Sequence, residues 1–76
     1  MATATVYTRN NCTACTATKV TMDRLGIRYT EINVEDSPDI AWELVERGFR
    51  AMPVVVNLKG EWWAGFQKDK IESMVG

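Results

Sequence analysis

Two cysteines, Cys12 and Cys15, stand where a strand pattern gives way to a helix pattern. Residues 2–8 alternate and are rich in β-branched side chains, which predicts a short strand. Asn11 belongs to the residue types that are favoured at helix N-caps, so we expect a helix from about Cys12 to Leu25. The pair therefore predicts a β-α unit with both cysteines in the first turn of its helix.

Four residues at helical spacing form the predicted inward stripe of this helix: Cys15, Thr18, Met22 and Leu25. Gly26 is expected to end the helix from the position just after the C-cap. The threonines within the helix oppose this assignment locally, because β-branched side chains lower helix propensity.

The next segment alternates again over residues 27–34, which predicts a second strand. A helix then starts clearly, with Ser37 as N-cap and Pro38 at its first position, and Gly48 ends it. Two strands joined by a helix predict a parallel pair. The expected core face of the second helix carries Ala41, Leu44 and Val45.

The last third of the chain predicts a hairpin and a helix. Residues 54–56 are wholly apolar, as in a buried central strand, residues 59–60 form a turn, and residues 61–64 return. A final helix is expected over residues 67–75. The element order β-α-β-α-β-β-α places the chain in the α/β class. The inward residues of the last helix are expected to be Ile71 and either Met74 or Val75.

Length and charge restrict the class of protein. A chain of 76 residues suffices for one domain, 1–76, and 46% of the residues are hydrophobic. Nine basic and ten acidic residues are well mixed, so no basic stripe points to nucleic acid. No apolar run approaches membrane length, and the first residues do not resemble a signal peptide. We expect a cytoplasmic monomer that needs no membrane or nucleic acid.

The sequence contains no histidine, so its chemistry has to rest on the two cysteines. A helix N-terminus lowers the pKa of a thiol, and Arg9 is expected to add positive charge nearby. Thr13 and Ala14 are small and leave the first sulfur accessible. We expect Cys12, at the exposed helix tip, to attack a disulfide, and the inward Cys15 to resolve the mixed disulfide.

Other interpretations of the pair carry less weight. A closed zinc site needs four ligands, and one chain supplies only two cysteines and no histidine. A purely structural disulfide is rare in cytosolic proteins. A binding module that is redox-gated, or that bridges a metal between two chains, stays open as an alternative.

Two further segments are candidates for partner contacts. Pro53, after Met52, either starts a strand or forms a cis proline beside the dithiol, whose preceding backbone pairs with a substrate strand. Trp62 and Trp63 are adjacent in a predicted strand, so their side chains point to opposite faces. One of them is therefore expected to be exposed, and with Phe66 to provide a docking surface for a protein.

With these residues in place, the chain resembles the NrdH-redoxins, glutaredoxin-sized members of the thioredoxin superfamily. The similarity rests on residues 6–9 leading into the cysteine pair, on residues 52–56 and on residues 63–66, and it covers almost the whole chain. It implies a thioredoxin-like fold with a four-stranded mixed sheet and three helices, with Pro53 in cis. Asn10, where the family often has proline, and Gln67-Lys68 depart from the family pattern.

The resemblance also implies a function. It points to a dithiol–disulfide oxidoreductase that donates electrons to a class Ib ribonucleotide reductase and is recharged by NADPH-dependent thioredoxin reductase. No cofactor is implied beyond the Cys12–Cys15 pair. Trp63, Gly65 and Phe66 match the segment where glutaredoxins bind glutathione, and Phe66 is expected to crowd such a site. A glutathione- or mycothiol-dependent glutaredoxin is the alternative.

Overall fold

The computed structural model of the protein describes residues 2–75. Its four strands form one sheet in the order β2-β1-β3-β4. β1 runs parallel to β2 and antiparallel to β3, and β4 is antiparallel to β3. The expected β-α-β-α-β-β-α order and the mixed four-stranded sheet with three helices are confirmed. In chain order the elements are β1 (Ala4–Thr8), α1 (Thr13–Arg24), β2 (Tyr29–Asn33), a short 3₁₀ helix η1 (Val34–Asp36), α2 (Pro38–Glu46), β3 (Val54–Asn57), β4 (Trp62–Ala64), α3 (Lys68–Glu72) and a second 3₁₀ helix η2 (Ser73–Val75).

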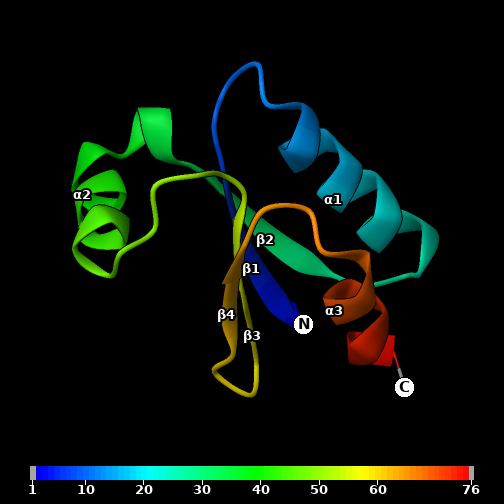
Figure 1. Ribbon diagram of the computed structural model, residues 1–76. Coiled ribbons are helices and arrows are strands. Elements are labelled where there is room, and N and C mark those ends of the chain that lie inside the picture. The colour runs from blue at the N-terminus through cyan, green and yellow to red at the C-terminus, as the bar shows by residue number, and fades with distance from the viewer. Residues whose placement is uncertain (1, 76) are drawn as a thin grey trace.

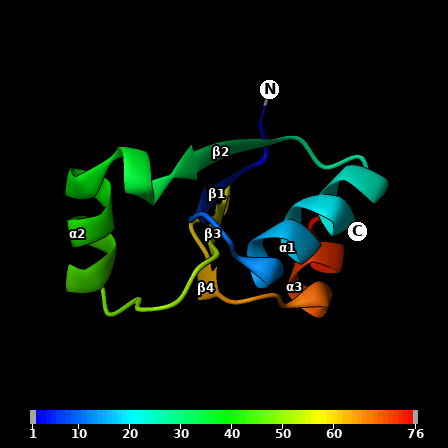
Figure 2. The ribbon, with the colours of Figure 1, turned by 90° about the horizontal axis from the view of Figure 1, so that it is seen from above.

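The helices cover both faces of the sheet. α1 and α3 lie on one face, and α2 lies on the other (Figures 1 and 2). Strand side chains alternate between the two faces, so each face collects its own hydrophobic cluster. The cluster under α1 and α3 contains Ala4, Val6, Met22, Ile27, Val55, Trp63 and Ile71. The cluster under α2 contains Val34, Leu44 and Val54, with partly buried residues around them.

The second helix begins and ends as predicted. Ser37 is its N-cap, Pro38 is its first residue, and Gly48 follows the end with a φ of 94°, which glycine adopts without strain. Its buried side differs slightly from the prediction. Val45 is exposed, and Ile40 packs with Ala41 against the cluster in its place.

The C-terminal ends of α1 and α3 also differ from the prediction. Leu25 is the C-cap of α1 and is exposed, because the chain turns at Gly26 and Ile27 enters the core in its place. The final helix is shorter than expected, since α3 ends at Glu72 and continues as η2. Of the predicted inward residues, Ile71 is buried and Met74 packs on the core, while Val75 is exposed.

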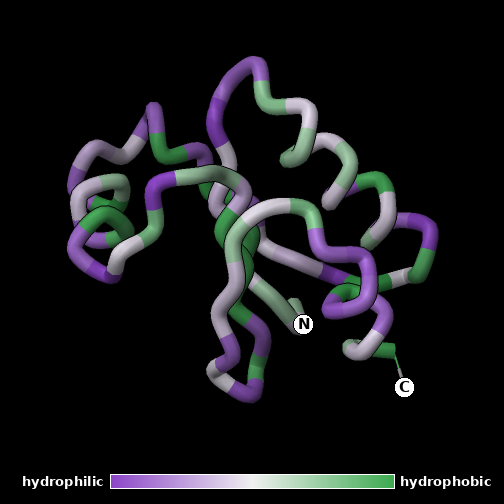
Figure 3. Tube along the Cα trace, in the orientation of Figure 1, coloured by the Kyte–Doolittle hydropathy of each residue, from purple (hydrophilic) through white to green (hydrophobic). Residues whose placement is uncertain are grey.

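Two of the connecting segments are rich in polar residues. The loop before α1 is strongly hydrophilic, and so is the turn between β3 and β4 (Figure 3). These two segments lie at opposite ends of the sheet, since Thr8 at the end of β1 leads into the first and Ala4 at its start pairs with Asn57. No helix in the described part of the chain is long and apolar enough to cross a membrane. The hydrophilic loop before α1 is the one that leads into the cysteine pair.

Candidate active site

Cys12 is itself the N-cap of α1. Its backbone is extended, with a φ of −118°, and its Sγ accepts a hydrogen bond of 3.1 Å from the backbone N–H of Cys15. The prediction of Asn11 as N-cap is wrong by one residue. Asn11 has a φ of 54°, in the left-handed region that asparagine tolerates better than most residues, and it turns the chain into the helix. The sulfur thus takes the place that an N-cap oxygen ordinarily fills.

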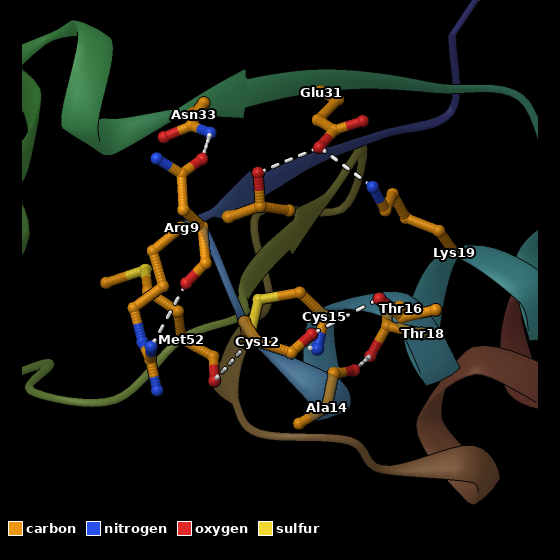
Figure 4. The surroundings of a disulfide bond; sticks show 12 residues. Arg9, Cys12, Ala14, Cys15, Thr16, Thr18, Lys19, Glu31, Asn33 and Met52 are labelled. Carbon is orange, nitrogen blue, oxygen red and sulfur yellow. Dashed lines mark hydrogen bonds and ion pairs between the residues drawn. A yellow bond between two sulfur atoms is a disulfide. The ribbon is translucent and has the colours of Figure 1, made fainter.

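Cys12 and Cys15 form a disulfide, with their Cα atoms 5.2 Å apart, within the usual range for such a bond. Cys15 is 2% exposed and Cys12 is 8% exposed. The inward position of Cys15 agrees with the prediction, whereas Cys12 is more enclosed than the exposed helix tip that was expected. The segment that encloses it includes Met52, whose carbonyl oxygen lies 3.6 Å from Cys12 Sγ (Figure 4).

The position of Cys12 favours its thiolate once the disulfide is reduced. Unpaired N–H groups and the positive end of the helix dipole stabilise negative charge at a helix N-terminus. Arg9 lies in the loop beside the pair, where its guanidinium donates to the carbonyl oxygen of Asn10 at 3.3 Å (Figure 4). Thr13 is exposed next to Cys12, and Ala14 is half-buried. The arrangement can therefore form an attacking thiolate at Cys12.

Two of the threonines of α1 form side-chain hydrogen bonds within the helix. Thr16 donates its hydroxyl to the carbonyl oxygen of Cys12, and Thr18 donates to that of Ala14 at 2.9 Å. Such bonds to the preceding turn satisfy a hydroxyl that would otherwise be costly to bury. Thr18 is fully buried behind the dithiol for this reason.

A polar hollow of about 530 Å³ opens beside the dithiol on the side of β2. At its rim Glu31 Oε2 accepts hydrogen bonds from Thr8 Oγ1 at 2.8 Å and from Lys19 Nζ at 3.1 Å (Figure 4). Burial raises the pKa of Glu31, but these two bonds outweigh it and hold the pKa below its ordinary value. The hollow is lined by Arg9, Asn10, Asn11, Cys12, Thr13, Cys15, Thr16, Lys19, Glu31 and Asn33.

The Met52–Pro53 peptide bond is cis, as the resemblance implied. The carbonyl oxygen of Pro53 accepts a hydrogen bond of 2.8 Å from the N–H of Gly65. This bond joins the segment after β4 to the segment that touches Cys12. Phe66, the next residue, is 42% exposed. The predicted contact residues Met52 and Pro53 therefore lie beside the dithiol, and Gly65 and Phe66 belong to a second segment that this hydrogen bond joins to them.

Comparison with known proteins identifies the family of the chain. The glutaredoxin family model matches residues 4–63. The glutaredoxin-like protein NrdH of Salmonella typhimurium is 44% identical over 71 residues, which cover 92% of this chain and 85% of the relative. The NrdH-redoxin of Escherichia coli superposes with a TM-score of 0.89 at 41% identity, covering 93% of this chain and 92% of that structure. The chain belongs to the NrdH-redoxins of the glutaredoxin family. It is a thiol–disulfide oxidoreductase with a redox-active cysteine pair.

The adjacent tryptophans of β4 divide, as predicted, into a buried and a partly exposed member, but the buried one is Trp63. Trp63 was placed among the partner contacts, but its ring lies in the core with 5% exposed. The pairing of Trp63 with the buried Val55 explains this position. Trp62 is the partly exposed member, and it stacks with Tyr7 and Phe49. Trp63 thus anchors the strand that leads to Gly65, and Trp62 faces the other side.

Sequence reasoning missed a group of residues from β1, α1 and β2 next to the NrdH-redoxin dithiol. Thr8, Lys19 and Glu31 meet at the hollow although Glu31 lies 23 residues after Thr8 along the chain. No local motif signals such contacts, since they depend on the parallel pairing of β1 with β2. Among residues 2–75, no three His, Cys, Asp or Glu side chains gather in a group that could hold a metal ion.

Proposed function

We propose that this NrdH-redoxin is a cytoplasmic electron donor to a class Ib ribonucleotide reductase and is recharged by NADPH-dependent thioredoxin reductase. One observation carries the choice of protein partners over glutathione. Gly65 is tied to Pro53 beside Cys12, and it is followed by the exposed ring of Phe66. A large apolar side chain at this point favours contact with a protein surface and takes up space that glutathione would need. The Escherichia coli relative, described as having a thioredoxin-like activity profile, supports the same choice.

The reaction follows from the proposed roles of the two thiols. Cys12 thiolate attacks one sulfur of the substrate disulfide, forms a mixed disulfide and releases the other sulfur as a thiolate, which takes a proton. Cys15 thiolate then attacks Cys12 Sγ and forms the Cys12–Cys15 disulfide. The second substrate sulfur leaves and is protonated in turn. The substrate gains two electrons and two protons. The enzyme supplies both electrons and the proton that Cys15 loses, and solvent supplies the other proton.

The partner surface would be made of the residues around the attacking sulfur. Arg9, Thr13 and Ala14 flank the pair on the side of α1. Met52 and Pro53 flank it on the other side, where Pro53 is bonded to Gly65, the residue before Phe66. The carbonyl oxygen of Met52, close to Cys12 Sγ, is the group we expect to align the backbone of a substrate segment. Main-chain pairing of this kind orients an extended segment with little demand on its side chains.

The deciding experiment compares two reductants on the oxidised protein. NADPH with thioredoxin reductase should reduce it rapidly, and glutathione with glutathione reductase should reduce it poorly. Rapid reduction by glutathione alone would favour the small-thiol alternative, for which Arg9 and the polar hollow offer a place for a carboxylate. Metal analysis of anaerobically purified protein addresses the metal-bridged module, which requires stoichiometric zinc or iron.

Two cysteine variants test the assigned roles. Cys12→Ser should abolish turnover, because the attacking sulfur is lost. Cys15→Ser should instead accumulate a stable mixed disulfide between Cys12 and the substrate, which mass spectrometry detects. If Cys15 carries the substrate in the reciprocal experiment, the two roles are reversed.

A further inference from the structure

Asn10, Asn33 and Glu35 form a ring of hydrogen bonds between the loop before Cys12 and the end of β2. The backbone N–H of Asn10 donates to Glu35 Oε2 at 2.6 Å. The backbone N–H of Glu35 donates to Asn33 Oδ1 at 2.9 Å, and Asn33 Nδ2 donates to Asn10 Oδ1 at 2.9 Å. Each of the three residues thus donates one hydrogen bond and accepts another. A proline in place of Asn10 would break the ring, because it has no N–H.

The ring joins two segments that are far apart in the sequence. Asn10 lies in the loop before Cys12, while Asn33 ends β2 and Glu35 belongs to η1. Asn33 points toward that loop (Figure 4). Only Asn11, with its left-handed backbone, separates the ring from Cys12. Fixing Asn10 therefore restricts the direction in which the chain enters α1.

The position of the attacking sulfur depends on that direction. Cys12 Sγ accepts the N–H of Cys15 only while Cys12 keeps its extended N-cap conformation. A hydrogen bond to a thiolate stabilises it relative to the thiol. When two electrons reduce the disulfide, Cys15 takes a proton and Cys12 stays a thiolate to the extent that this bond persists.

We propose that Asn10, Asn33 and Glu35 are positioning residues that hold Cys12 Sγ on the N–H of Cys15 and thereby keep Cys12 reactive in the reduced protein. The inference rests on the proposed role of Cys12 as the attacking thiol. It adds that the reactivity of this thiol is set in part by a polar ring on the η1 side of the loop.

The test measures alkylation of the dithiothreitol-reduced protein by iodoacetamide as a function of pH, with the modified cysteine identified by mass spectrometry. Asn33→Ala removes two bonds of the ring and leaves every charge in place, namely Arg9, Lys19, Glu31 and Glu35 around the site and Arg50 on the segment before Met52. The pKa of Cys12 should be higher in Asn33→Ala than in the parent protein. At a pH well below this pKa, alkylation of Cys12 should therefore be slower in the variant by about three- to tenfold.

Asn57→Ala is the matched control at the other end of the sheet. Asn57 Oδ1 accepts the N–H groups of Lys59 and Glu61 at 3.0 Å, and its Nδ2 donates to Glu61 Oε1 at 2.8 Å. Asn57→Ala therefore removes a set of hydrogen bonds comparable to the set that Asn33→Ala removes. The control should keep the Cys12 alkylation profile of the parent protein, so a general loss of stability cannot explain the shift in Asn33→Ala.

A charge-matched pair covers the case in which Asn33→Ala does not fold. Glu35→Gln and Glu35→Ala both lose the negative charge, and only glutamine keeps an acceptor for the N–H of Asn10. The inference expects a higher Cys12 pKa in Glu35→Ala than in Glu35→Gln, and equal values would overturn it. Preferential alkylation of Cys15 in the parent protein would instead overturn the proposed role of Cys12, which is a different outcome.

Discussion

The two faces of the sheet are packed in different ways. The face under α1 and α3 holds seven buried residues with two partly buried neighbours. The face under α2 holds three buried residues with seven partly buried ones, among them Tyr7, Phe49, Met52 and Trp62. We call the first the closed face and the second the open face. The closed face is an apolar core, and the open face is an aromatic layer that reaches the surface.

The difference assigns separate tasks to the two faces. Met52 belongs to the open face, and its carbonyl oxygen lies beside Cys12 Sγ. Residues of the open face are therefore continuous with the attacking sulfur, and a partner that reaches Cys12 would meet them. The α1 side of the sheet also holds Cys15 and Thr18, which are buried. We infer that the closed face supplies stability and the open face supplies recognition.

Truncation in the closed face should produce the largest loss of stability. Ile71 of α3 is fully buried in its cluster. Ile71→Ala removes apolar contacts and leaves a cavity, and we expect it to lower the free energy of unfolding by about 2–5 kcal/mol. Urea denaturation of the oxidised protein measures this loss. Reductase activity per folded molecule should stay near that of the parent, and a selective loss of activity would contradict the assignment.

Truncation in the open face should affect recognition more than stability. Trp62 stacks on Tyr7 and Phe49, with ring centroids 6.1 and 5.9 Å away, and Arg47 lies 4.4 Å above its ring. Trp62 is only partly buried whereas Ile71 is fully buried, so Trp62→Ala leaves less of a closed cavity, and we expect a smaller loss of stability than in Ile71→Ala. Its KM for a protein disulfide should rise several-fold, while reduction of a small disulfide should change little.

Trp42→Ala is the control for the Trp62 experiment. Trp42 also lies on the α2 side, but it is 65% exposed. An exposed residue away from packed contacts usually changes stability by less than about 0.5 kcal/mol. If Trp42→Ala raises the KM as much as Trp62→Ala does, recognition does not depend on the stacked layer.

The sequence was sufficient for features that depend on local chemistry. Ser37, Pro38 and Gly48 define the ends of α2 through their own backbone preferences, and the structure confirms them. The cysteine pair predicted the first turn of α1 in the same way. Alternation along β4 also showed that the two tryptophans point apart. It could not decide which of them is buried, because that follows from the register of Trp63 with Val55 on β3.

The remaining features depend on contacts between distant segments. The N-cap was assigned to Asn11 because an amide oxygen is the usual acceptor, whereas the left-handed φ of Asn11 passes that role to Cys12. The ring of hydrogen bonds around Asn10 includes Asn33 and Glu35. These two residues lie next to Asn10 only because β2 pairs with β1. Such polar contacts leave no periodic pattern in the sequence.

Substitution of Glu31, which lies with Thr8 and Lys19 at the polar edge of the closed face, should produce the smallest loss of stability, and this loss should depend on pH. Glu31 has a pKa below its ordinary value in the folded protein because of its bonds to Thr8 and Lys19, which outweigh the effect of burial. A carboxyl whose folded pKa is depressed stabilises the fold above its unfolded pKa, and this contribution is lost as the pH falls through the folded pKa. Glu31→Gln should therefore destabilise the protein at neutral pH and should match the parent in acid.

The size of this effect is limited by solvent. The side chain of Glu31 is 38% exposed and that of Lys19 is 31% exposed, and ion pairs of this kind contribute about 0–1 kcal/mol. Thermal unfolding of the parent and of Glu31→Gln, followed from neutral to acidic pH, gives two curves that should converge as the carboxyl is protonated. A gap that persists in acid would show that the hydrogen bond from Thr8 acts through packing and not through the charge of Glu31. In that case Glu31 contributes to stability through the packing of the closed face and not through its charge.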